Sequence, residues 1–114
     1  MGLFWKSDSD YIIEDIQELV GQINQKLTTL QESLVANNGP SDENIVLIGN
    51  IFEQMAPLQN QVEDKFNQLS SSKQSKVMVP WVDGRYFPFA MWAMSYNMYI
   101  RRIQAGIKKY ANNI

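Results

Sequence analysis

Residues 13–34 of the chain read IEDIQELVGQINQKLTTLQESL, and they show the clearest periodic pattern in the sequence. Aliphatic side chains recur in it at alternating intervals of three and four residues, which places them on one face of a helix through three heptads. The members of this stripe are Ile13, Ile16, Val20, Ile23, Leu27, Leu30 and Leu34. We expect a helix over about 10–36. Because an isolated helix gains too little from burial to offset the entropy of its ordered backbone, it needs a partner surface.

A second stripe with nearly the same period follows a turn signal at 37–40, which reads NNGP. Its members are Ile48, Ile51, Met55, Leu58, Val62, Phe66 and Leu69. The pattern predicts a helix over about 41–70, opened by Pro40 and Ser41. Because Pro57 removes a backbone hydrogen bond and clashes with the preceding turn, we expect this helix to be kinked or broken near 57. The polar run at 70–75 predicts the most flexible point of the chain.

The segment 77–89 reads VMVPWVDGRYFPF and differs in character from both helices. Asp83-Gly84 between two β-prone runs is a hairpin signal, which is weakened because Pro80 and Pro88 each remove a donor from a strand ladder. We therefore expect an ordered loop over 71–87, with a short hairpin of two paired strands as the alternative.

A last helix is predicted over about 88–110, since proline is favourable at a first helical position. One of its faces is formed by Phe89, Trp92, Tyr96, Tyr99 or Ile100, Ile103 and Ile107, and a second stripe by Met91, Met94 and Met98. Because the early part of this helix is apolar nearly all round, we expect it to be buried on more than one side.

Together these elements predict an all-α chain, folded as a single domain over 1–114 into an antiparallel three- or four-helix bundle. The positions that flank the first stripe are mostly uncharged and include Gln17, Asn24, Lys26, Gln31 and Ser33. Uncharged flanks fix neither one register nor one oligomeric state, so a homodimer formed through the heptad helices stays open.

The composition argues against catalysis and metal binding. The chain contains neither histidine nor cysteine, and these two residues supply the commonest general base, the thiol nucleophile and most transition-metal ligands. The carboxylates are expected to face water, and the lysines beside Ser72 and Ser75 are expected to be too well solvated to activate a serine. We therefore expect no enzyme, no catalytic residues, no cofactor and no metal.

Charge is divided unequally along the chain. Residues 1–70 hold eleven acidic residues and three lysines, giving −8, whereas residues 71–114 hold one acidic and seven basic residues, giving +6. A polarised charge of this kind suits steering onto one complementary surface.

Aromatic and basic residues gather in the C-terminal region, and these residue types dominate protein interfaces. The predicted partner-binding residues are Trp81, Arg85, Tyr86, Phe87, Trp92, Tyr96, Arg101 and Arg102. Trp92 and Tyr96 also belong to a helical stripe, so a core position is the competing interpretation for them. The function predicted from this pattern is a protein-binding or regulatory module, such as an adaptor, an inhibitor or an immunity-like protein.

Two other functions compete with this prediction. A peripheral membrane protein could place the aromatic last helix, with its terminal arginines and lysines, at a lipid headgroup surface. A weak single-stranded nucleic-acid binder could stack bases on Trp81 or Tyr86, although the acidic half would repel phosphate. The N-terminus lacks the long apolar run of a signal peptide, and a cytoplasmic location is expected.

Overall fold

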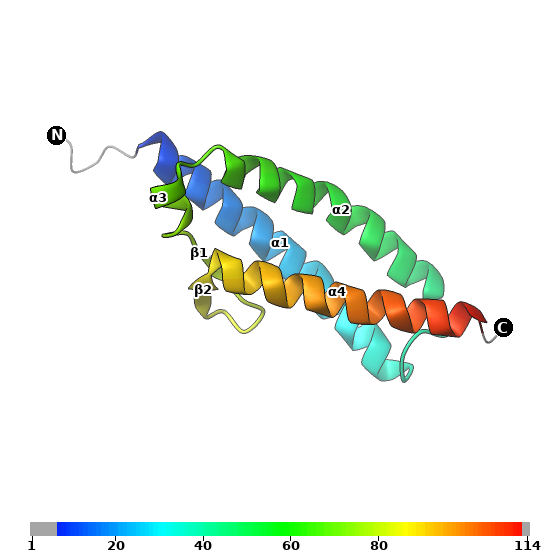
Figure 1. Ribbon diagram of the computed structural model, residues 1–114. Coiled ribbons are helices and arrows are strands. Elements are labelled where there is room, and N and C mark those ends of the chain that lie inside the picture. Colours follow the sequence, from blue (N-terminus) through cyan, green and yellow to red (C-terminus); the bar gives the residue numbers. More distant parts are fainter. Residues whose placement is uncertain (1–6, 113–114) are drawn as a thin grey trace.

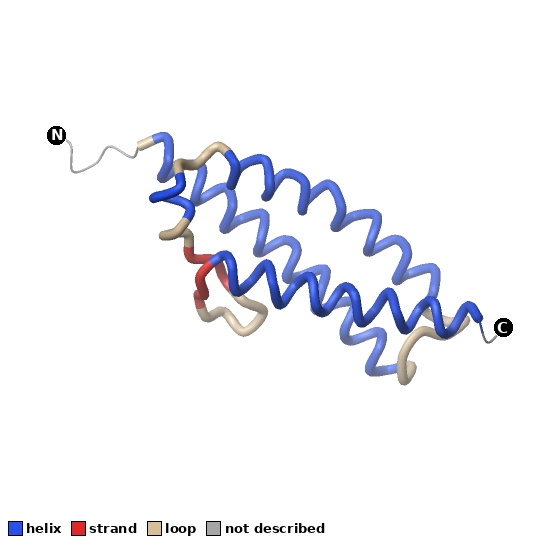
Figure 2. Tube along the Cα trace, viewed as in Figure 1, coloured by secondary structure: helices blue, strands red, loops and turns tan. Residues whose placement is uncertain are grey.

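The computed structural model describes residues 7–112 of the chain. The elements are α1 (Asp8–Ala36), α2 (Ile45–Asn67), α3 (Ser71–Gln74), β1 (Met78–Pro80), β2 (Tyr86–Pro88) and α4 (Phe89–Asn112). The chain is mostly helical, with one small two-stranded sheet, so the all-α class is confirmed at this level. The hairpin and α3 lie at one end of the long helices α1, α2 and α4 (Figures 1 and 2).

Helix α1 begins at a capping box. The hydroxyl of Ser7 accepts a hydrogen bond from the Asp10 backbone N–H at 3.2 Å, and the Asp10 carboxylate accepts one from the Ser7 backbone N–H at 3.1 Å. These bonds satisfy donors that a helix start leaves unpaired, and they start the helix two residues before the predicted position. The end at Ala36 is as predicted. Asn38 and Gly39 follow in the left-handed region, with φ of 56° and 107°.

The turn between α1 and α2 is organised by the buried side chain of Asn44. Its amide donates to the backbone oxygens of Ser33 at 3.3 Å and Gly39 at 3.0 Å, and its oxygen accepts from the Ser41 backbone N–H at 2.8 Å. Residues 42–44 are therefore held in a turn, and α2 begins at Ile45. The predicted start at 41 is wrong for this reason.

The core lies between α1 and α2, which run in opposite directions. The predicted stripe of α1 faces inward: Ile16, Val20, Ile23, Leu27 and Leu30 are buried, and Ile13 and Leu34 at its ends are half-buried. Helix α2 contributes Ile48, Ile51, Met55 and Val62 to the same core. The stripe therefore has the partner surface that it was expected to need.

Pro57 does not break α2, which runs without interruption from Ile45 to Asn67. Pro57 is exposed, and so is Glu53, the residue four positions earlier whose backbone oxygen loses its helical donor. Because both residues face water, solvent can satisfy that oxygen. The predicted break is wrong, and of the two alternatives only a kink is compatible with the continuous helix.

The serine-rich run after α2, predicted to be the most flexible point of the chain, contains a short helix, α3. The Ser70 hydroxyl accepts from the Lys73 backbone N–H at 3.4 Å, which caps the helix. The Gln74 amide donates to the backbone oxygen of Phe66 at 3.0 Å and so ties α3 to the end of α2. Local side-chain bonding of this kind gives a polar run a defined conformation.

Strands β1 and β2 form the antiparallel hairpin that was the alternative to a loop, with Val79 opposite Phe87. Ladder bonds flank this pair: Phe89 donates to the Val77 backbone oxygen at 2.9 Å, and Trp81 to that of Arg85 at 2.7 Å. In an antiparallel ladder such pairs alternate with unbonded ones. Pro80 and Pro88 occupy the unbonded positions, so the two prolines remove no ladder bond.

Helix α4 returns alongside α1 and ends at the α1–α2 turn, where the Tyr110 hydroxyl donates to the Asp42 carboxylate. One face of this helix is buried and carries Trp92, Tyr96 and Ile103. The opposite face is open, and Met91, Met94 and Met98 on it are exposed. The expected burial on more than one side is therefore wrong, since no described element covers the outer side of α4.

Candidate functional site

A buried asparagine of α1 joins three elements at one point. Asn24 accepts a hydrogen bond from the indole N–H of Trp92 at 3.1 Å, and its amide donates to the backbone oxygen of Pro80 at 2.7 Å. Seven residues earlier, the Gln17 amide donates to the backbone oxygen of Met78 at 2.9 Å. These bonds hold β1 against α1 and connect α4 to α1.

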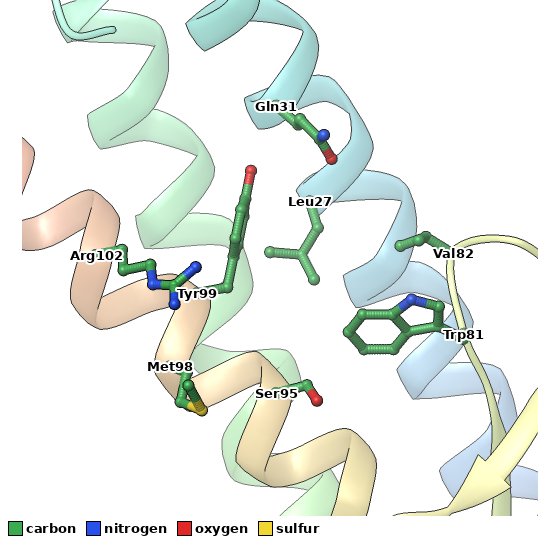
Figure 3. Close-up of a pocket in the computed structure, with 8 residues that line it drawn as sticks. All are labelled: Leu27, Gln31, Trp81, Val82, Ser95, Met98, Tyr99 and Arg102. Atoms are coloured by element: carbon green, nitrogen blue, oxygen red, sulfur yellow. The ribbon is translucent and has the colours of Figure 1, made fainter.

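Beside this junction the surface is hollowed between α1, the hairpin and α4. The hollow has a volume of about 260 Å³. Its walls are Leu27 and Gln31 from α1, Trp81 and Val82 from the hairpin, and Ser95, Met98, Tyr99 and Arg102 from α4. In Figure 3, Trp81 and Tyr99 lie on either side of Leu27, and Gln31 and Arg102 lie farther along the hollow. The lining is thus apolar in the middle, with polar groups at its margin.

Two further hollows extend this one in both directions. One, of about 340 Å³, shares Gln31, Tyr99 and Arg102 with it and reaches Pro40 and Gly106. The other, of about 190 Å³, shares Trp81 and Ser95 with it and reaches Phe87 and Met91. Because neighbouring hollows share lining residues, the three adjoin one another, and we call them together the α1/α4 groove.

The outer face of α4 borders the groove and is unusually apolar for an exposed surface. Met91, Met94 and Met98 are 50%, 61% and 51% exposed, and their spacing places them in one row, here called the methionine stripe. Methionine is unbranched and polarizable, so it adapts to the shape of what it contacts and is common at binding surfaces. Apolar rows of this kind mark interaction sites.

The same helix is one-sided in charge. α4 contains no acidic residue, and its four cations, Arg101, Arg102, Lys108 and Lys109, are exposed. Within residues 7–112 the ion pairs are Lys65 with Asp15 and Arg85 with Asp83, so none of the α4 cations has an acidic partner there. This end of the groove carries uncompensated positive charge.

The predicted partner-binding residues divide into three groups. Trp81, Phe87 and Arg102 line the groove. Trp92 and Tyr96 are only 2% and 4% exposed and belong to the core, as the competing interpretation held, although Trp92 also lines the hollow of about 190 Å³. Arg85, Tyr86 and Arg101 are exposed and line none of the hollows described above.

Arg85 is engaged within its own loop. Its guanidinium forms an ion pair with Asp83 at 2.7 Å and lies over the Phe87 ring, 5.6 Å from the centroid. The hydrogen bonds from Arg85 lower the pKa of the Asp83 carboxyl, and the same contact raises the pKa of the Arg85 side chain. Gly84, with φ of 86°, permits the tight turn between them. The loop that carries Trp81 is thereby given a defined shape.

Two tyrosines of α4, Tyr96 and Tyr99, remain neutral at physiological pH. Burial is the main cause that raises the pKa of Tyr96, with the Glu63 carboxylate adding to it, and burial also raises the pKa of Tyr99. In the groove, Tyr99 therefore presents a neutral hydroxyl that can donate or accept a hydrogen bond.

In the central hollow, sequence reasoning missed six lining residues: Leu27, Gln31, Val82, Ser95, Met98 and Tyr99. The exposure of Met98 had a signal, because the methionines lie off the face that carries Trp92 and Tyr96. The position of Gln31 opposite α4 had none, because it depends on where the last helix crosses the first.

Neither histidine nor cysteine occurs in the chain, and no cluster of carboxylates among the described residues is placed to hold a metal ion. No helix in residues 7–112 is long and apolar enough to cross a membrane. The chain matches no known protein family, no curated protein and no solved structure.

Proposed function

We propose that this protein is a non-enzymatic protein-binding or regulatory module, in which the three long helices act as one bundle-like scaffold for the α1/α4 groove. The observation that carries the proposal is the groove beside the methionine stripe: an apolar depression with Gln31, Tyr99 and Arg102 at its margin. Small sets of placed polar groups around an apolar centre are typical of recognition sites.

The shape favours a protein partner over a lipid surface. A bilayer is flat on the scale of one helix, and helices that lie on it insert bulky aromatic side chains from a convex face. Here Trp81 is half-buried against Phe87, with ring centroids 6.4 Å apart, and Trp92 is in the core. The exposed apolar side chains of α4 are methionines beside a concave surface, which suits another protein's side chains.

Differential affinity capture in the native host tests the proposal. The variant Met91→Gln with Met98→Gln keeps side-chain length and makes the groove border polar. The matched control, Val46→Gln with Leu47→Gln, changes two other exposed apolar residues, which lie on α2 and line none of the three hollows. We expect specific proteins captured by the wild type to be lost with the first variant and kept with the control.

Circular dichroism confirms that both variants remain helical before capture. Equal capture by all three baits, or equal loss from both variants, would show that the groove is not the binding surface. Recovery of anionic lipid vesicles in place of protein would support the membrane alternative.

A further inference from the structure

The charge on the walls of the α1/α4 groove restricts what can lie in it. On the α4 side Arg102 lines the groove, and Arg101 lies next to it without an acidic partner among the described residues. On the α1 side the exposed charge nearest Gln31 in the sequence is Glu32, which lines a neighbouring hollow outside the groove. An occupant that complements both walls carries negative charge where it faces α4 and no excess of negative charge where it faces α1.

The spacing of the exposed side chains on α4 favours a helix as the occupant. The methionine stripe is a row at intervals of three and four residues, and such rows form ridges that fit the grooves of a second helix. The groove follows α4 from Met91 to Gly106, which is about 22 Å at ~1.5 Å per residue. An occupying helix of about four turns, roughly 15 residues, covers that length.

Strand addition to the hairpin is a poor alternative. An added strand needs free backbone donors and acceptors along a sheet edge. On the outer edge of β1, the oxygens of Met78 and Pro80 already accept from Gln17 and Asn24. Pro80 and Pro88 have no N–H to offer on the outer edges of the two strands.

We propose that the groove binds an acidic amphipathic helix of a partner protein. Its apolar side chains contact the methionine stripe and the lining around Trp81, and its carboxylates face Arg102 and Arg101. This inference deepens the proposed function and rests on it. It adds the chemical class of the partner: an anionic helix rather than a basic helix, an extended strand or a second copy of this chain.

A pair of helix-locked peptides tests the inference. Both have about four turns and leucines in one row. One carries glutamates beside the row and its twin carries lysines. We expect the acidic peptide to bind the full-length protein at least about tenfold more tightly than the basic twin. Raising sodium chloride from about 0.05 M to about 0.5 M should weaken it, because exposed charges are screened.

Carbon-13 labelling of the methionine methyl groups locates the binding. The acidic peptide should shift the signals of Met91, Met94 and Met98 and leave that of the buried Met55 unchanged. Arg102→Glu should weaken binding several-fold, whereas Glu32→Lys, on α1 just outside the groove, should maintain or strengthen it. Both positions are exposed, so neither change disturbs the core.

Several results would overturn the inference. They are equal or tighter binding of the basic twin, binding that leaves the three methionine signals unmoved, and no binding of either peptide. Sedimentation with phosphatidylserine vesicles that abolishes peptide binding would assign the surface to lipid. Self-association that shifts the same methionines would assign it to a second copy. Partner capture that still depends on Met91 and Met98 would then leave the proposed function standing.

Discussion

At the scale of single residues, the fold depends on a few polar side chains in apolar surroundings. Asn24 interrupts neither the heptad stripe nor the helix, yet its two hydrogen bonds connect α1 to the hairpin and to α4. Buried polar groups are costly when unpaired and define one arrangement when fully paired. All buried side-chain nitrogen and oxygen atoms of the described residues have partners. The groove therefore lies beside a junction with a single geometry.

Replacing Asn24 with alanine should destabilise the protein strongly. The change leaves the Trp92 indole N–H and the Pro80 backbone oxygen without partners in a buried place, and each such loss costs about 1–3 kcal/mol. We expect the free energy of unfolding in urea to fall by about 2–4 kcal/mol.

Gln17→Ala is the matched control. It removes the other α1 bond to β1, but at an exposed position, so a loss of about 1 kcal/mol or less is expected. A loss for Asn24→Ala no larger than for Gln17→Ala would contradict the role assigned to the junction.

At the scale of the elements, α4 has two different faces. The inner face stacks Trp92 on Tyr96 with ring centroids 5.2 Å apart, and Phe89 on Phe66 at 4.3 Å. The outer face shows methionines in its first half and arginines and lysines in its second. α4 therefore carries apolar side chains on both faces, and only those of the inner face are buried.

Methionine oxidation should report that open side directly. In dilute hydrogen peroxide we expect Met78, Met91, Met94 and Met98 of the folded protein to form sulfoxides about tenfold faster than Met55, because oxidation of a thioether follows its exposure. Met55 is buried in the core and the other four are exposed. Peptide mass spectrometry over a time course measures the rates.

Unfolding the protein in urea before oxidation is the control, and it should remove the difference. If Met55 in the folded protein reacts as fast as the methionine stripe, the assignment of the two faces of α4 is wrong.

Much of the element structure could be predicted from the sequence. The stripe of α1 faces the core because a period of three and four residues leaves a helix one way to bury it. The bounds that failed depend on tertiary contacts. α2 starts at Ile45 because Asn44 bonds to Ser33 and Gly39, and that geometry exists only after the chain has turned.

The candidate site was harder to predict than the elements. Tryptophan, tyrosine and arginine indicated the region in which Trp81, Phe87 and Arg102 line the groove. Residue type could not separate core from surface, so Trp92 and Tyr96 were included although they are buried. The contribution of Leu27 and Gln31 depends on how α4 crosses α1, which no local pattern encodes.

In the whole molecule, the charge that is divided unequally along the sequence is also divided unequally between the helices. The four basic residues of α4 gather in its second half, and α1 and α2 hold most of the acidic residues. A molecule polarised in this way orients an approaching partner before contact, and its association slows as salt is raised. That arrangement suits a protein whose role is recognition.

Light-induced crosslinking in the native host tests whether the α1/α4 groove is the surface that contacts a partner protein. A photoreactive benzoylphenylalanine replaces Met98, which lines the groove, or Val46, which lines none of its hollows and is likewise exposed. We expect a discrete crosslinked protein adduct from position 98, and we expect no adduct of the same mass from position 46. The same adduct from both positions, or none from position 98 when the protein is fully helical, would contradict the proposal.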